Sequence, residues 1–131
     1  MKKIELFLPI LIISEANNSD HWTKKRKRKL AQQTCIRAYM LNRYEYHLPC
    51  TVTLKRIGAR LLDYDNLVHS FKSIRDQIAE IIIEYQDEIK NSGPSVSHKR
   101  AKGSHDSDPR IQWKYAQETG KNKGIKVEIE A

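Results

Sequence analysis

Four short segments of the chain have the hydrophobic pattern of β-strands. The first, Ile4–Ile13, is an apolar run that contains Pro9, so we expect an edge strand or a bulge there. In Cys50–Ile57, apolar and polar residues alternate. The segments Arg110–Gln117 and Gly124–Glu130 also alternate, and a turn rich in Gly and Lys joins them. This arrangement predicts that the last two strands form a hairpin.

Two longer segments have apolar residues at helical spacing, in which every third or fourth position shares one face. In Thr23–Tyr44, the repeating positions are Leu30, Thr34, Ala38 and Leu41, with Ala31 and Cys35 beside them. In Asn66–Lys90, the stripe is longer and consists of Leu67, Phe71, Ile74, Ile78, Ile81, Ile82, Tyr85 and Ile89. Asp65 stands where the N-cap of this second helix would lie. The order β-α-β-α-β-β predicts an α/β (α+β) fold, with a mixed sheet flanked by two helices.

The length of 131 residues suits a single domain that spans residues 1–131. Residues 91–104 are polar and contain Gly, Pro and Ser, which is typical of a flexible linker within that domain. Three cations, Lys99, Arg100 and Lys102, charge this segment.

The N-terminus has the outline of a secretory signal, because a basic start, Met1–Lys3, precedes the apolar run and small residues follow it. Glu5 and Pro9 interrupt that outline, and the run is too short to span a membrane. Cys35 and Cys50 could form one disulfide in a secreted protein, but they do not form a Cys-x-x-Cys pair. We therefore expect a cytoplasmic protein with two free cysteines, one on a helix and one opening a strand.

The chain is strongly basic, with a net charge of +8 and an isoelectric point near 9.5. A basic excess on so short a chain favours an anionic partner, and nucleic acid is the usual one. Six consecutive cations open the first predicted helix, where the helix dipole prefers anions. A solvated, frayed helix start would explain them, but contact with phosphates would offset the electrostatic cost. The candidate DNA-binding residues are Lys24, Lys25, Arg26, Lys27, Arg28 and Lys29.

Two carboxylates, Asp63 and Asp65, lie two residues apart just before the second predicted helix. In an extended segment they would point to the same side, and paired carboxylates of this kind suit Mg²⁺. A helix cap beside a surface acid is the alternative interpretation. His69 and Lys72 follow Asp65 on one helix face, and helical side chains lean toward the N-terminus. Lys72 could therefore stabilise charge on a phosphate held near the carboxylates.

A second acidic pair, Asp106 and Asp108, precedes Pro109 at the boundary of a loop and a predicted strand. Sites are commonly built at such boundaries, although Asp-x-Asp-Pro also forms good turns. Two acidic pairs at the edges of regular elements are difficult to attribute to chance in so basic a chain, because acids would weaken DNA binding unless they held a metal.

An ordered set of these motifs resembles the RusA family of Holliday-junction resolvases, particularly its phage-borne branch. The set consists of Asp63-Tyr64-Asp65-Asn66-Leu67, then Lys72 and Asp76, then Asp106-Ser107-Asp108-Pro109-Arg110-Ile111, with Trp113, Tyr115 and Gln117. Ser14-Glu15-Ala16-Asn17 and His21-Trp22 also resemble that branch, which argues further against a signal peptide. The chain departs from the family pattern at His105, where an acid is usual, and in its longer linker.

The resemblance implies a homodimer that binds four-way DNA junctions and cuts them symmetrically, in recombination and repair, with Mg²⁺ or with Mn²⁺ as a substitute. It implies that Asp63, Asp65 and Asp106 bind the metal and are catalytic together with Lys72. Asp108, His69 and His105 are lesser candidates.

Two other functions remain open at this stage. One is a catalytically inactive, basic DNA-binding protein that retains the fold. The other is a zinc or redox protein that uses the cysteines and scattered histidines, although their spacings fit no ligand pattern. These histidines are His21, His47, His98 and His105.

Overall fold

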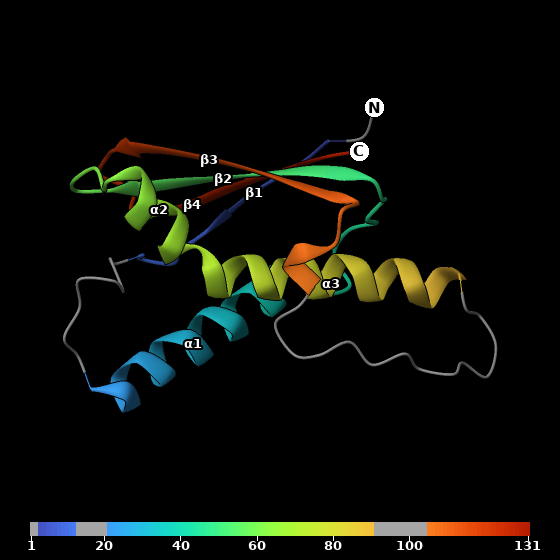
Figure 1. The fold of residues 1–131 in the computed structure, drawn as a ribbon, viewed down its shortest axis with the longest axis horizontal. Coiled ribbons are helices and arrows are strands. Elements are labelled where there is room, and N and C mark those ends of the chain that lie inside the picture. The colour runs from blue at the N-terminus through green and yellow to red at the C-terminus, as the bar shows by residue number, and fades with distance from the viewer. Residues whose placement is uncertain (1–2, 13–20, 91–104) are drawn as a thin grey trace.

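The structure, a computed structural model, describes residues 3–12, 21–90 and 105–131 (Figure 1). The predicted linker, residues 91–104, lies outside these ranges, as does the Ser14–Asn17 motif. The fold is α+β. Its elements in chain order are β1 (Lys3–Leu8), α1 (Trp22–Met40), β2 (Cys50–Gly58), α2 (Tyr64–Ser70), α3 (Lys72–Lys90), the short 3-10 helix η2 (His105–Ser107), β3 (Ile111–Thr119) and β4 (Gly124–Glu130).

The four strands form one mixed sheet in the order β1-β4-β2-β3. β2 runs parallel to β3 and antiparallel to β4, while β1 is an edge strand that pairs with β4 alone. The predicted hairpin is therefore wrong, because β2 lies between β3 and β4. The reason is burial: Ile125, Val127 and Ile129 of β4 are almost completely covered, so β4 occupies a central position instead of an edge.

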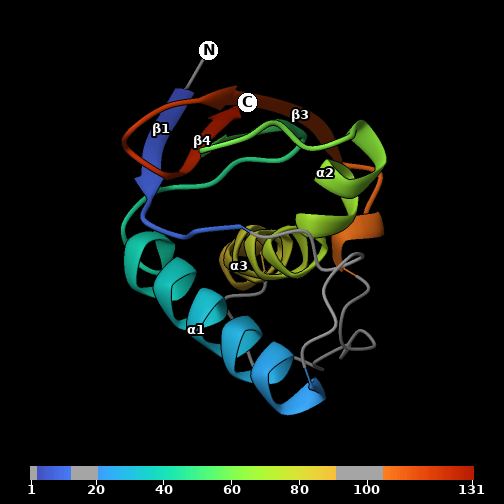
Figure 2. The same ribbon diagram turned by 90° about the vertical axis from the view of Figure 1, so that its left-hand side faces the viewer.

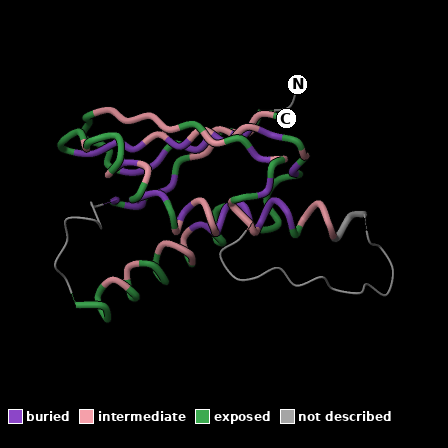
Figure 3. The backbone as a smooth tube through the Cα atoms, viewed as in Figure 1, coloured by how far each residue is buried: buried purple, intermediate pink, exposed green. Residues whose placement is uncertain are grey.

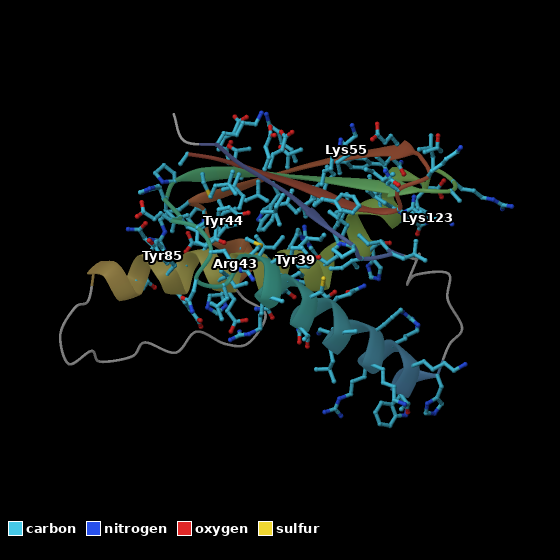
Figure 4. The ribbon with its side chains drawn as sticks, turned by 180° about the vertical axis from the view of Figure 1, so that it is seen from behind. Tyr39, Arg43, Tyr44, Lys55, Tyr85 and Lys123 are labelled. Atoms are coloured by element: carbon cyan, nitrogen blue, oxygen red, sulfur yellow. The ribbon has the colours of Figure 1, made fainter. Side chains whose placement is uncertain are left out.

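The helices cover one face of the sheet, and the core lies between the two layers (Figures 1 and 2). Alternate residues of β2 point into this core, including Val52 and Leu54 as their pattern predicts. The opposite face of the sheet is polar, with Lys55 on it (Figure 4). The alternation read from the sequence therefore identified correctly which residues of the central strand face inward.

The first helix differs from its predicted stripe. Leu30 and Leu41 are exposed, and the side chains that α1 buries are Ile36 and Met40. The N-terminal part of α1 is exposed or half-buried (Figure 3). The helix ends at Met40, not at Tyr44, and Asn42 follows with a positive φ of 60°. Asparagine tolerates this left-handed conformation better than most residues, so the chain turns there.

The second predicted helix is divided into α2 and α3, so the described part of the chain has three α-helices where two were predicted. The break falls at Phe71, whose backbone N–H bonds to the Val68 carbonyl three residues earlier. Phe71 is fully buried, and the apolar stripe continues across the break through Ile74, Ile78 and Ile82. The helical spacing therefore predicted the buried face correctly. It did not predict the break at buried Phe71, where the backbone hydrogen bond spans three residues instead of four.

The first strand also ends earlier than predicted, at Leu8, with Pro9 immediately after it. Proline cannot donate to a sheet ladder, and here it marks the end of an edge strand. Cys35 and Cys50 are both free, on α1 and at the start of β2 as expected. No helix within the described ranges is long and apolar enough to cross a membrane.

Candidate functional site

The first acidic pair lies at the start of α2 and not on an extended segment. Asp63, not Asp65, is the N-cap residue, and Asp65 lies in the first helical turn. The Asp63 side chain does not cap a backbone N–H; its Oδ2 accepts a hydrogen bond from Asn66 Nδ2 at 3.2 Å. Both carboxylates are exposed at the positive end of the α2 dipole.

The loop that leads into this pair is fixed from two sides. The side chain of Gln117 on β3 makes hydrogen bonds to both backbone groups of Leu62. Its Oε1 accepts from the Leu62 N–H at 2.8 Å, and its Nε2 donates to the Leu62 carbonyl at 2.7 Å. The buried Arg56 of β2 donates to the Arg60 carbonyl at 2.6 Å and to the Ile12 carbonyl at 3.3 Å. The position of Asp63 is thus set by side chains of the two neighbouring parallel strands.

Tyr115, two residues before Gln117 on β3, connects the two acidic regions. Its ring lies edge-on to Tyr64, between the two acids of the first pair, with ring centroids 6.5 Å apart. Its hydroxyl accepts a hydrogen bond from Arg75 Nη1 at 2.6 Å, and Arg75 Nη2 lies 3.5 Å from Asp106 Oδ2. A continuous series of contacts therefore runs from the start of α2 to the second acidic pair.

The second acidic region is centred on Asp106 in η2, which packs against α3 (Figure 1). Lys72 Nζ lies 2.8 Å from Asp106 Oδ2 and 2.9 Å from Asp76 Oδ1, so one ammonium binds two carboxylates. The Asp106 side chain is only 11% exposed and that of Asp76 17%. Trp113 Nε1 donates to the Asp106 backbone carbonyl at 3.1 Å and holds η2 against β3.

The pKa values of these groups diverge. Burial raises the pKa of Asp76, and the negative charge of Asp106 adds to that effect while Lys72 opposes it. Burial also acts to raise the pKa of Asp106, but hydrogen bonds from Lys72 and Asp76 and the charge of Arg75 outweigh it and lower the net value. Burial acts to lower the pKa of Lys72, yet its two carboxylate partners raise it overall. Lys72 is therefore an ammonium throughout the neutral range.

A groove of about 230 Å³ lies beside this cluster, between α1 and the α2–α3 segment. Lys25 and Lys29 of the basic run line one wall. His69, Lys72 and Asp76 line the other. The groove thus places two of the predicted DNA-binding residues next to the predicted catalytic lysine.

The predicted site residues are only partly brought together. Lys72 contacts Asp106, but it binds Asp76 rather than leaning toward Asp65. Among the described residues, no group of three or more His, Cys, Asp or Glu side chains is arranged to hold a metal ion. Of the lesser candidates, His69 lies on the groove wall and His105 opens η2.

Asp108 has a different environment from Asp106. Its side chain is 2% exposed and binds Arg110 through both oxygens, at 2.9 and 3.0 Å, as well as the Arg110 backbone N–H at 3.0 Å. This is the turn chemistry that an Asp-x-Asp-Pro sequence favours. Asp108 therefore stabilises the entry to β3.

The sequence analysis placed Asp76 in the set of RusA-like motifs without assigning it a role, and it did not single out Arg75, although both face Asp106. Asp76 lies four residues after Lys72, a spacing at which oppositely charged side chains meet on a helix. That spacing, together with the place of Asp76 in the motif set, was the available signal for its contact with Lys72. No pattern could reveal Arg75, because its partners come from η2 and β3.

Comparison with known proteins identifies no relative: no family model, curated protein or solved structure matches the chain.

Proposed function

We propose that the protein is a metal-dependent, structure-specific endodeoxyribonuclease that resolves Holliday junctions and other branched DNA, with a RusA-like fold. The observation that carries this proposal is the position of the Lys72 ammonium between Asp76 and Asp106, beside a groove lined by Lys25 and Lys29. Metal-dependent cleavage of DNA requires carboxylates that can bind a cation, and a neighbouring basic surface that can bind the phosphate backbone. The chain's net charge of +8 agrees with this substrate.

The chemistry of the donors suits Mg²⁺. Asp76 and Asp106 already face one positive charge at hydrogen-bonding distance, and Mg²⁺ characteristically takes one or two protein carboxylates and completes its shell with water and phosphate oxygens. We propose Asp106 and Asp76 as ligands, with Asp63 and Asp65 as the further acids that the family resemblance implies. A bound Mg²⁺ would activate water and stabilise the charge on the cleaved phosphate; Mn²⁺ would substitute for it.

The protein's own cations have separate tasks in this proposal. Lys72 would donate to a phosphate oxygen of the DNA and stabilise the charge that develops on it. Arg75, held by Tyr115, would keep Asp106 ionised and fixed in place. Two strands of a junction must be cut, so we propose a homodimer that presents two such sites.

The test is cleavage of a synthetic four-way junction with Mg²⁺, compared with the same reaction in EDTA. We expect divalent-dependent cutting that Asp63→Asn, Asp65→Asn and Asp106→Asn each abolish, with DNA binding kept or tightened because a repelling charge is lost. Glu128→Gln, on the polar outer face of the sheet, is the matched control and should cut normally. Binding of the junction without cutting by the parent would favour the non-catalytic DNA-binding protein instead.

A further inference from the structure

The face of α1 that packs on α3 changes character along the helix. Met40 and Ile36 are fully buried, and Gln32, one turn nearer the N-terminus, accepts a hydrogen bond from Ser73 of α3 at 2.8 Å. The next positions on the same face are Lys29 and Lys25, since spacings of four, three and four residues return to one side of a helix. The inward face of α1 thus begins with cations.

These two lysines line the groove described above. The N-terminal end of α1 diverges from α2 and α3 (Figures 1 and 2). The groove is lined by residues of α1 on one side and of α2 and α3 on the other. Across it stand His69 and Lys72, with Ser70 and Ser73 between them at the floor. Lys72 is already paired with Asp76 and Asp106, so the positive charge that an incoming anion would meet in the groove comes mainly from Lys25 and Lys29.

The shape of the groove restricts the kind of anion. Its volume of about 230 Å³ is below the roughly 300–1,000 Å³ usual for pockets that enclose small-molecule ligands. Its walls offer ammonium and hydroxyl groups together with the Gln32 amide, the His69 imidazole and the Asp76 carboxylate. No Phe, Tyr or Trp side chain lies among the described residues that line it. These features suit the sugar–phosphate backbone better than a nucleobase.

We propose that this groove binds the backbone phosphates of the DNA strand that is cut, through Lys25 and Lys29, and leads that strand to Asp106. The inference rests on the proposed function. It separates the cations of the basic run that line the groove from those that do not. Lys24 and Lys27 project from other sides of α1, do not line the groove and attract DNA only over longer range.

The test compares two double variants of the full chain that lose the same charge. Lys25→Ala/Lys29→Ala removes the groove cations, and Lys24→Ala/Lys27→Ala is the matched control on the same helix. Binding of a fluorescent four-way junction is measured in EDTA over a series of salt concentrations. Two lost phosphate contacts should flatten the log–log salt dependence by about 1.4–1.8, and the control should change it by less than half as much.

Equal changes in the two double variants would overturn the groove assignment. Circular dichroism of both variants checks that α1 stays folded. The cleavage assay separates this inference from the proposed function. If the parent cuts junctions and the two variants behave alike, the groove assignment fails alone. If only the groove variant loses affinity and the parent never cuts, the nuclease proposal fails and the phosphate groove stands.

Discussion

Gln117 holds Leu62 as a neighbouring strand would, because its side-chain amide accepts from the Leu62 N–H and donates to the Leu62 carbonyl. Leu62 directly precedes Asp63, so the edge strand β3 fixes the entry to the first acidic pair. Two other residues on the inward face of β3 also make hydrogen bonds to the site: Trp113 donates to the carbonyl of Asp106, and Tyr115 accepts from Arg75. One strand thus supports both acidic regions.

We predict that Gln117→Ala reduces cleavage more than its effect on folding explains. Loss of two hydrogen bonds to a partly buried backbone should lower the free energy of unfolding by about 1–3 kcal/mol. At a temperature where the variant is still folded, cutting should fall because Asp63 is less well fixed. Urea unfolding and junction cleavage measure the two effects, with Gln112→Ala on the exposed face of β3 as the control. Full cleavage by folded Gln117→Ala protein would contradict a positioning role.

Much of the fold was predictable because hydrophobic periodicity reports which side chains are buried. The spacing correctly identified Val52 and Leu54 of β2, the inward residues of β4, and most of the buried stripe from Leu67 to Ile82. It did not identify the buried Ala79 and Ile83 of α3, and the predicted Ile89 side chain lies outside the described residues. The stripe of α1 was not, because its N-terminal half packs on little: Leu30 is 51% exposed, and the true contact face there is made by Gln32 and cations. A helix that extends beyond the core carries no reliable hydrophobic pattern.

Strand order was not predictable from local pattern. A short turn between two alternating segments normally indicates a hairpin. Here residues 120–123 carry the chain past β2 to a central place in the sheet, where the inward-facing Ile125, Val127 and Ile129 of β4 are almost completely buried. Strand pairing depends on partners that are distant in sequence, which the alternation of a single strand does not identify.

The candidate site was also predictable only in part, because residue types can be read from the sequence and tertiary contacts cannot. Lys72 and Asp106 were singled out by residue type, and the structure joins them. Their contacts with Asp76 and Arg75 depend on how η2 docks against α3, a tertiary relationship that no spacing records apart from the four-residue interval of the Lys72–Asp76 pair.

The two acids of the second pair should respond differently to the same substitution. Asp108→Asn leaves Arg110 without its carboxylate at a buried turn, so we expect the free energy of unfolding to fall by about 2–3 kcal/mol. Asp106→Asn should cost less stability and abolish cutting. Urea unfolding curves and junction cleavage of both variants test this division. Loss of cutting by stable Asp108→Asn protein would give Asp108 a direct role in the reaction.

The two thiols should react with alkylating reagents in a fixed order. Burial raises the pKa of Cys50 to about 11, and it also raises the pKa of the less buried Cys35. Because the thiolate is the reactive form, Cys50 should remain unmodified by iodoacetamide at pH 8 in the folded protein, while Cys35 is alkylated slowly. Mass spectrometry of digested protein measures both sites. In urea the two should react at similar rates, and faster labelling of Cys50 in native protein would contradict its place in the core.

Lys72→Met should separate metal binding from catalysis. In the proposed mechanism, a divalent cation would displace the Lys72 ammonium from between Asp76 and Asp106 in the parent. Methionine keeps most of the side-chain volume without the charge, so the Mg²⁺ concentration that half-maximally raises the Tm should fall severalfold. Cutting at saturating Mg²⁺ should nevertheless fall by about 10²–10³, the usual cost of one group that stabilises developing charge. Lys114→Met, on the exposed face of β3, removes the same charge away from the site and should change neither quantity. An unchanged Mg²⁺ midpoint in Lys72→Met protein would mean that the cation binds elsewhere, while unchanged cutting would leave Lys72 with a purely structural part in holding η2 on α3.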